Sequence, residues 1–244
     1  MRFPRATRFP LYRQAAILER EVGVEIGRAT LDGWVMRVGE LLVPVVGAMR
    51  KDLLSGDYLQ ADETTIPVQM HDRRGSNHEA YLWQYGRPGG EAVFDFCLGR
   101  GREGPLKFLG NWEGILQTDG YQAYDGVGGP KLVHVGCWAH ARRKLVDAVK
   151  VHPQDGEAVK MVVRMDTLFL IDRETRKHAM TNAERLVFRR EHALPWVDEI
   201  REACLMVSKQ AEYLGQGRGL YVEHVGQAGA LLRIRTSRVV EQSG

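Results

Sequence analysis

The chain has 244 residues, which is enough for one large core or for one core with a smaller appended part. Hydrophobic residues make up 44% of it and charged residues 27%, which excludes a wholly disordered chain, a collagen-like repeat and a coiled-coil rod. The formal net charge of +3 permits a nucleic-acid partner without arguing for one. No run reaches the about 18 apolar residues of a membrane helix, and the three scattered cysteines suggest no disulfide framework. We therefore expect a cytoplasmic protein with neither a membrane helix nor a signal peptide.

Two helices are predicted within residues 1–50. The first, LYRQAAILEREV, is expected to end near Gly23, because glycine readily adopts the left-handed conformation that closes a helix. The second carries apolar residues at helical spacing, namely Leu31, Trp34, Val35, Val38, Leu41 and Leu42. A helix, a short turn and a second helix form the outline of a helix-turn-helix, which binds DNA. A helical hairpin that merely packs on the next domain fits the pattern equally well.

Polar and basic residues in two places could contact DNA phosphates. In the helical pair these are Arg13, Arg20, Arg28, Thr30 and Arg37. Further along, Arg142, Arg143 and Lys144 are consecutive on one predicted helix, so they cannot all face the core. A solvated helix face without any DNA contact explains the second group equally well.

The middle of the chain, from about residue 57 to residue 138, is rich in strand patterns. Three short runs with β propensity, YLQADETTIPVQ, AYLWQYGR and AVFDFCL, precede a predicted helix over GREGPLKFLGNW. The strands GILQTD and KLVHVGCW follow, and the helical AHARRKLVDAVK leaves the second of them. The order β-β-β-α-β-α-β-α predicts an α/β fold whose mixed sheet has helices packed on it. Helical spacing then continues from about residue 155 to residue 209.

Two aspartates are candidates for metal binding. Asp62 lies inside a predicted strand, where β propensity disfavours a carboxylate, and Asp119 ends another strand. Acids from neighbouring strands can meet at one sheet edge and hold Mg²⁺, a hard ion that takes oxygen ligands. A pair of ions about 4 Å apart can activate water and stabilise the leaving oxygen in phosphodiester cleavage. In isolation, Asp119 is better explained as a turn or capping residue.

Cys137 and His140 form a C-x-x-H pair at a strand-to-helix junction. This is half of a zinc site, and the chain has no second pair to complete it, so we predict a structural role near the active edge. The glycine-rich segments lack the G-x-x-x-x-G-K pattern, so no nucleotide cofactor is expected.

Several segments resemble the transposases of the insertion sequence 66 family, among them ADETTIPVQ, GREGPLKFLGNWEGILQTDGYQAY and above all CWAHARRKLVDAV. The similarity is nearly continuous from about residue 8 to residue 210. It implies a ribonuclease-H-like core at 51–152, preceded by a helical DNA-binding segment at 1–50 and followed by a helical insertion at 153–210. It also implies cleavage of transposon ends and strand transfer into target DNA. The implied cofactor is Mg²⁺ or Mn²⁺, and the implied partners are DNA and either a second copy or an intact transposase.

The resemblance assigns roles to individual residues. Asp62 matches the family's first acid and Asp119 its second, while Cys137 and His140 match a C-x-x-H pair after the fifth strand. The family's third acid is a glutamate in an NNxAE box, and this sequence contains no such box. The tail holds the glutamates Glu212, Glu223 and Glu241, and none of them has that context.

The tail, residues 211–244, is glycine-rich and has no sustained hydrophobic period. Codons exist for which GQGRGLYVEHVGQAGAL, read one base further on, gives GKAAAYTLSMWGKLVR, which resembles a family segment. We therefore expect a frameshift between about residues 210 and 215, and a chain truncated at both ends relative to the family. The leading interpretation is a transposase or its remnant that is inactive alone. A non-catalytic DNA-binding regulator of intact transposase and a small Mg²⁺-dependent nuclease remain as alternatives.

Overall fold

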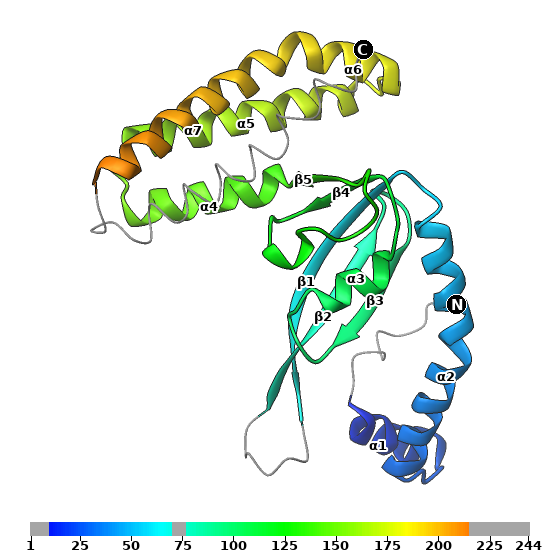
Figure 1. Cartoon of the computed structure of the whole chain (residues 1–244). Helices are drawn as coiled ribbons and strands as arrows, with labels where there is room; N and C mark the ends of the chain where they lie inside the picture. Colours follow the sequence, from blue (N-terminus) through cyan, green and yellow to red (C-terminus); the bar gives the residue numbers. More distant parts are fainter. Residues whose placement is uncertain (1–9, 70–76, 215–244) are drawn as a thin grey trace. The chain divides into compact units, whose positions relative to one another are not determined.

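The computed structural model describes residues 10–69 and 77–214, and the chain divides into two compact units at Ser55 and Gly56. The first unit contains α1 (Leu11–Val22) and α2 (Arg28–Leu53), which pack against each other (Figure 1). Helix α1 ends at Gly23, whose φ of 69° is the left-handed conformation predicted for that glycine. The predicted helix pair is therefore confirmed, although α2, at 26 residues, continues past residue 50.

The apolar residues of α2 do not form a buried stripe within the first unit. Leu31 is buried there, but the other five residues of the predicted stripe are 49–72% exposed: Trp34, Val35, Val38, Leu41 and Leu42. Helical spacing therefore identified the helix without identifying what covers it.

The second unit begins with a five-stranded mixed sheet in the order β3-β2-β1-β4-β5. Its strands are β1 (Tyr58–Val68), β2 (His78–Gly86), β3 (Ala92–Cys97), β4 (Ile115–Thr118) and β5 (Val133–Gly136). Strands β1, β2 and β3 pair antiparallel, whereas β1, β4 and β5 pair parallel. The predicted α/β class and mixed sheet are confirmed, but the helix predicted between the fourth and fifth strands is wrong. The element between β4 and β5 is only a 3₁₀ turn, η2 (Gln122–Tyr124).

One face of the sheet is packed and the other is exposed around β1–β3. Helix α3 (Glu103–Leu109) covers the packed face, where the ring of Phe108 stacks on Tyr85 at 3.7 Å. Gly104 is suited to this interface, because a Cβ there would lie 3.1 Å from the Cys97 sulfur. Side chains alternate along a strand, so Leu59 and Ala61 are buried on this face while Asp62 is on the exposed one.

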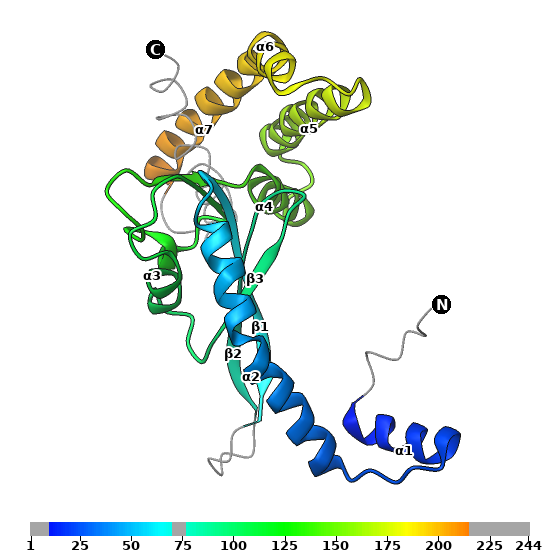
Figure 2. The ribbon, with the colours of Figure 1, turned by 90° about the vertical axis from the view of Figure 1, so that its right-hand side faces the viewer.

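Four helices follow the sheet: α4 (Trp138–Val151), α5 (Gly156–Lys177), α6 (Asn182–His192) and α7 (Leu194–Leu214). Helix α5 packs against both α4 and α7 (Figure 1 and Figure 2). Their shared core contains the residues Ala141, Leu145, Met161, Met165, Ile200 and Cys204. Capping supports the helix starts, since Asp155 accepts backbone hydrogen bonds at α5 and Thr181 forms a capping box with Glu184 at α6.

None of the helices in residues 10–69 and 77–214 has the length and apolarity that crossing a membrane requires. The tail beyond Leu214, with Glu223 and Glu241, lies outside the described residues, and so does the expected frameshifted segment from residue 215 onward.

Candidate functional site

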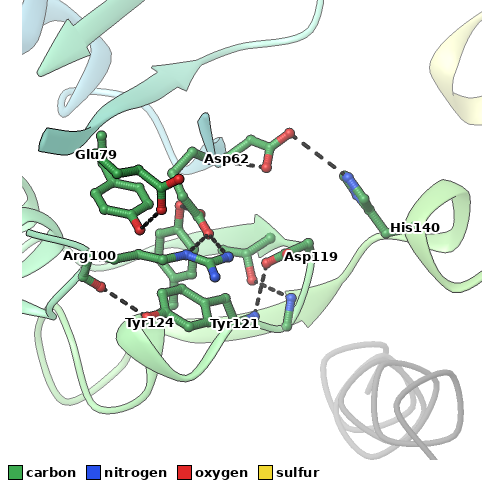
Figure 3. A network of polar contacts seen from close by, with 11 residues as sticks. Asp62, Glu79, Arg100, Asp119, Tyr121, Tyr124 and His140 are labelled. Atoms are coloured by element: carbon green, nitrogen blue, oxygen red, sulfur yellow. Dashed lines mark hydrogen bonds and ion pairs between the residues drawn. The ribbon is translucent and has the colours of Figure 1, made fainter. Parts of the chain in front are cut away.

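The register between two parallel strands places Asp62 and Asp119 at equivalent positions. Gln60 of β1 is paired with Gln117 of β4, and each aspartate lies two residues further along its strand direction. The Gln60 side chain donates to Oε1 of Gln117 at 2.7 Å, so these two paired side chains lie on the same face of the sheet and support the register. Strand β4 ends at Thr118, and Gly120, with a φ of 92°, turns the chain away directly after Asp119. Asp119 therefore follows the end of β4 at the level of Asp62, which lies within β1 (Figure 3).

Each carboxylate accepts a backbone hydrogen bond. Oδ1 of Asp62 accepts from the Glu63 N–H at 3.0 Å, and the Asp62 side chain is 57% exposed. Oδ1 of Asp119 accepts from the Tyr121 N–H at 2.9 Å, which forms an Asx turn after β4. The opposite oxygen of Asp62, Oδ2, lies 3.8 Å from Nε2 of His140 at the start of α4.

His140 is electrostatically coupled to both acids and to Cys137. Its Nδ1 atom is buried without a hydrogen bond of regular geometry to any described residue, and the Cys137 thiol is its polar neighbour. The interaction with Cys137 raises the pKa of His140 against the effect of burial, and the charges of Asp62 and Asp119 raise it further. Burial opposes ionisation of Cys137, but the interaction with His140 prevails and lowers the pKa of that thiol. The C-x-x-H pair therefore lies next to Asp62, and its role stays a prediction.

A second layer of residues lies on the packed side of the sheet next to the acids. The Glu63 side chain is only 2% exposed, and its Oε1 accepts from Nε of Arg100 at 3.1 Å and from Nη2 at 2.6 Å. Its Oε2 accepts from the Tyr124 hydroxyl at 3.1 Å. Burial raises the pKa of Glu63, Arg100 opposes that rise, and the nearby charge of Asp119 adds to it. Sequence reasoning missed Glu63, although it continues the buried alternation of Leu59 and Ala61.

His134 supports the turn that carries Asp119. Its Nε2 and the Thr118 hydroxyl are 2.7 Å apart, and the same hydroxyl accepts from the Gly120 N–H at 3.0 Å. Burial lowers the pKa of His134, so its neutral form is favoured although Asp125 and Asp119 oppose this. His134 is isolated in the sequence, without the spacing of a ligand pair, and its contact with Thr118 is visible only in the folded chain.

Comparison with known proteins identifies the family. The sequence profile described as "Transposase IS66 family" matches residues 6–219. The chain belongs to the IS66 transposase family. An uncharacterized protein of Sinorhizobium fredii (strain NBRC 101917 / NGR234), y4qI, is 33% identical over 192 residues, which cover 72% of this chain and 35% of the relative. A second uncharacterized protein of that organism, y4hP, is 30% identical over 217 residues, which cover 79% of this chain and 38% of the relative. The chain thus spans little more than a third of each of these relatives, and no solved structure matches it.

The basic residues predicted to contact DNA have different surroundings in this IS66-family chain. Arg142 forms an ion pair with Asp166 of α5, with one of its two contacts at 3.1 Å, whereas Arg143 is exposed and Lys144 is half-buried. In the first unit, Arg13 donates to the Tyr12 hydroxyl at 3.1 Å and Arg20 pairs with Glu21 at 2.9 Å. The remaining three, Arg28, Thr30 and Arg37, are exposed on α2.

The donor chemistry of Asp62 and Asp119 suits Mg²⁺ or Mn²⁺, because both supply hard carboxylate oxygens. Cys137 and His140 are softer ligands, and the proton favoured on His140 opposes its use as a ligand. Within residues 10–69 and 77–214, no group of three or more His, Cys, Asp or Glu side chains is arranged to hold a metal ion. The carboxylate of Glu63 also lies in this part of the site, but it is engaged by hydrogen bonds from Arg100 and Tyr124.

Proposed function

We propose that Asp62 and Asp119 are the first two metal-binding carboxylates of a ribonuclease-H-like transposase core, which cleaves transposon ends and transfers the strands to target DNA. The supporting observation is their equivalent register on adjacent parallel strands, with both charges acting on His140. Family membership supports DNA as the substrate. The proposed organisation keeps a helical DNA-binding segment before the core and a helical insertion after it.

The site's own residues would bind and orient the metal. Asp62 and Asp119 would hold Mg²⁺ or Mn²⁺, which supplies activation of the attacking oxygen and charge stabilisation at the leaving oxygen when bound. The backbone N–H of Glu63 donates to Oδ1 of Asp62, and that of Tyr121 donates to Oδ1 of Asp119. These two bonds do not involve the Oδ2 atom of either carboxylate. Nε2 of His140 lies 3.8 Å from Oδ2 of Asp62, so His140 in its protonated form would stabilise the carboxylate pair before a metal arrives.

The lack of a residue that matches the family's third acid limits the activity that we propose for this sequence. The sequence contains no NNxAE box, and correct placement of the metal ions in such cores depends on the full ligand set. We therefore propose a transposase or transposase remnant that binds metal weakly and does not complete strand transfer alone. Two other functions would give different results in the test below, namely a DNA-binding regulator without catalysis and a small Mg²⁺-dependent nuclease.

The test is Mn²⁺ binding by the full chain, followed by electron paramagnetic resonance of the free ion. Asp62→Asn and Asp119→Asn should each weaken binding by at least about 10-fold, a loss that even outer residues of metal sites can cause. Asp57→Asn is the matched control, because Asp57 is exposed just before β1 begins and has the same charge. Equal affinity in all four proteins would refute the proposed site.

DNA nicking in the same preparations separates the alternatives. Mg²⁺-dependent nicking of transposon-end DNA that disappears in Asp62→Asn would favour the nuclease and contradict the proposed inactivity. Salt-dependent binding to transposon ends without metal binding would favour the regulator.

A further inference from the structure

Two loops that are distant in sequence are fastened together beside the acids. Arg100 lies between β3 and α3, and Tyr121 lies just after β4. The guanidinium carbon of Arg100 lies 4.0 Å from the centre of the Tyr121 ring, so the two groups stack (Figure 3). In the reverse direction, the Tyr121 hydroxyl donates to the backbone oxygen of Arg100 at 3.0 Å. Each residue thus holds the other by a different contact.

Both ends of this contact lead to a candidate metal ligand. Tyr121 donates its backbone N–H to Oδ1 of Asp119, and Arg100 donates two N–H groups to Oε1 of Glu63. Glu63 directly follows Asp62 in β1, and its own N–H donates to the Asp62 carboxylate. A continuous series of contacts therefore joins the two acids on the packed side of the sheet.

We propose that Glu63, Arg100 and Tyr121 form a bridge that positions the Asp62 and Asp119 carboxylates relative to each other. The proposal rests on the proposed function of the two acids, and the bridge residues are positioning residues rather than ligands. We call these three residues the acid bridge. It adds a coupling between the strand that carries Asp62 and the loop after Asp119, beyond the hydrogen bonds of the sheet.

The residue types of the acid bridge fit this task. An arginine presents a planar fork that can bond a carboxylate through two N–H groups and stack on a ring at the same time, whereas a lysine cannot do both. A buried glutamate needs such a partner, because an unpaired carboxylate near Asp119 would add a third negative charge. The tyrosine supplies both the ring and the hydroxyl.

The test uses replacements that keep the charge of the site constant. Tyr121→Leu removes the ring and the hydroxyl but keeps the backbone N–H, and Arg100→Lys keeps the positive charge but loses the fork and the stack. Each should weaken Mn²⁺ binding by the full chain by about 10-fold, as expected for residues that orient metal ligands. Arg87→Lys is the matched control, since Arg87 pairs with Glu91 at the β2–β3 turn. Its Mn²⁺ affinity should equal that of the unmodified chain.

A second measurement does not depend on metal. Hydrogen exchange of the Tyr121 amide should accelerate in Arg100→Lys, because loss of the stack loosens its bond to Asp119, and should stay unchanged in Arg87→Lys. An unchanged exchange rate in Arg100→Lys, in a protein that unfolds at the usual temperature, would overturn the acid bridge alone. An unmodified chain whose Mn²⁺ binding is indifferent to Asp62→Asn would instead overturn the proposed metal function, and the exchange rates would still decide the bridge.

Discussion

Oδ2 of Asp62 faces Nε2 of His140 across 3.8 Å, so the first acid of the site is partnered by an imidazole from the start of α4. Burial opposes a charge on His140, but Cys137, Asp62 and Asp119 together raise its pKa above the ordinary value of 6.5. A metal ion bound at the proposed site would therefore compete with the imidazolium proton for the same carboxylates. This competition would make metal binding at the proposed site depend on the protonation of His140.

We predict that Mn²⁺ affinity increases as the pH rises through the raised pKa of His140. The proton on His140 is favoured below that pKa and repels the ion, and it is released above it, so the affinity can change by up to about 10-fold per pH unit below the pKa. His140→Gln should flatten the profile measured between about pH 6 and about pH 8. His178→Gln is the control, because His178 pairs with Glu174 on α5. A profile that stays equally steep in His140→Gln would show that another group titrates.

We predict that Cys137 is alkylated by iodoacetamide at lower pH than Cys97. The thiolate is the reactive form, and the interaction with His140 lowers the pKa of Cys137 although burial opposes this, whereas burial raises the pKa of Cys97. Peptide mass spectrometry over a pH series measures both residues in one sample. His140→Gln should move the Cys137 profile to higher pH and leave that of Cys97 in place. Coinciding profiles for the two thiols in the unmodified chain would contradict the proposed coupling.

The part of this site that could be predicted from the sequence is the part that depends on local patterns. Asp62 lies inside one predicted strand and Asp119 ends another directly before a glycine, so strand assignment alone suggested that the two acids could meet. The acid bridge could not be predicted, because the contact between Arg100 and Tyr121 depends on the conformations of two loops. Glu63 is intermediate between these cases. The sequence shows that it continues the alternation of Leu59 and Ala61, but it does not show that Arg100 is its partner.

The same distinction applies to the helices. Helical spacing after residue 155 predicted helices with an apolar face, and Met161 and Met165 of α5 are buried against the neighbouring helices. The ion pair between Arg142 and Asp166 depends on which turn of α5 faces α4, so the sequence showed only a run of cations. Glycines with positive φ at 120, 126 and 128 explain why the expected helix after β4 is limited to a single 3₁₀ turn.

We predict that Arg143 contributes more to DNA binding than Arg142. Arg142 already forms an ion pair with Asp166, whereas Arg143 is exposed on the same helix. Arg143→Gln should reduce the slope of log affinity against log salt by about 0.9, the value for one lost phosphate contact. Arg142→Gln should leave the slope unchanged and lower the free energy of unfolding by less than about 1 kcal/mol, as is usual for a solvent-accessible ion pair. Fluorescence anisotropy with labelled DNA and urea unfolding measure the two effects, and a reversed order would refute the assignment.

The last prediction separates Arg28 from Arg37 on α2. Nine residues at about 100° each place the two side chains on opposite sides of the helix, so one DNA duplex can contact only one of them. Arg28 is the first residue of α2, where a helix N-terminus favours phosphate, whereas Arg37 lies between the exposed apolar residues Met36 and Val38. DNA-binding surfaces are polar and positively charged, so the apolar surroundings argue against Arg37. We therefore expect Arg28→Ala to lower the salt slope by about 0.9 and Arg37→Ala to leave it unchanged in the same anisotropy titrations. A slope that neither replacement alters would remove α2 from the DNA interface and favour the helical hairpin as a packing element.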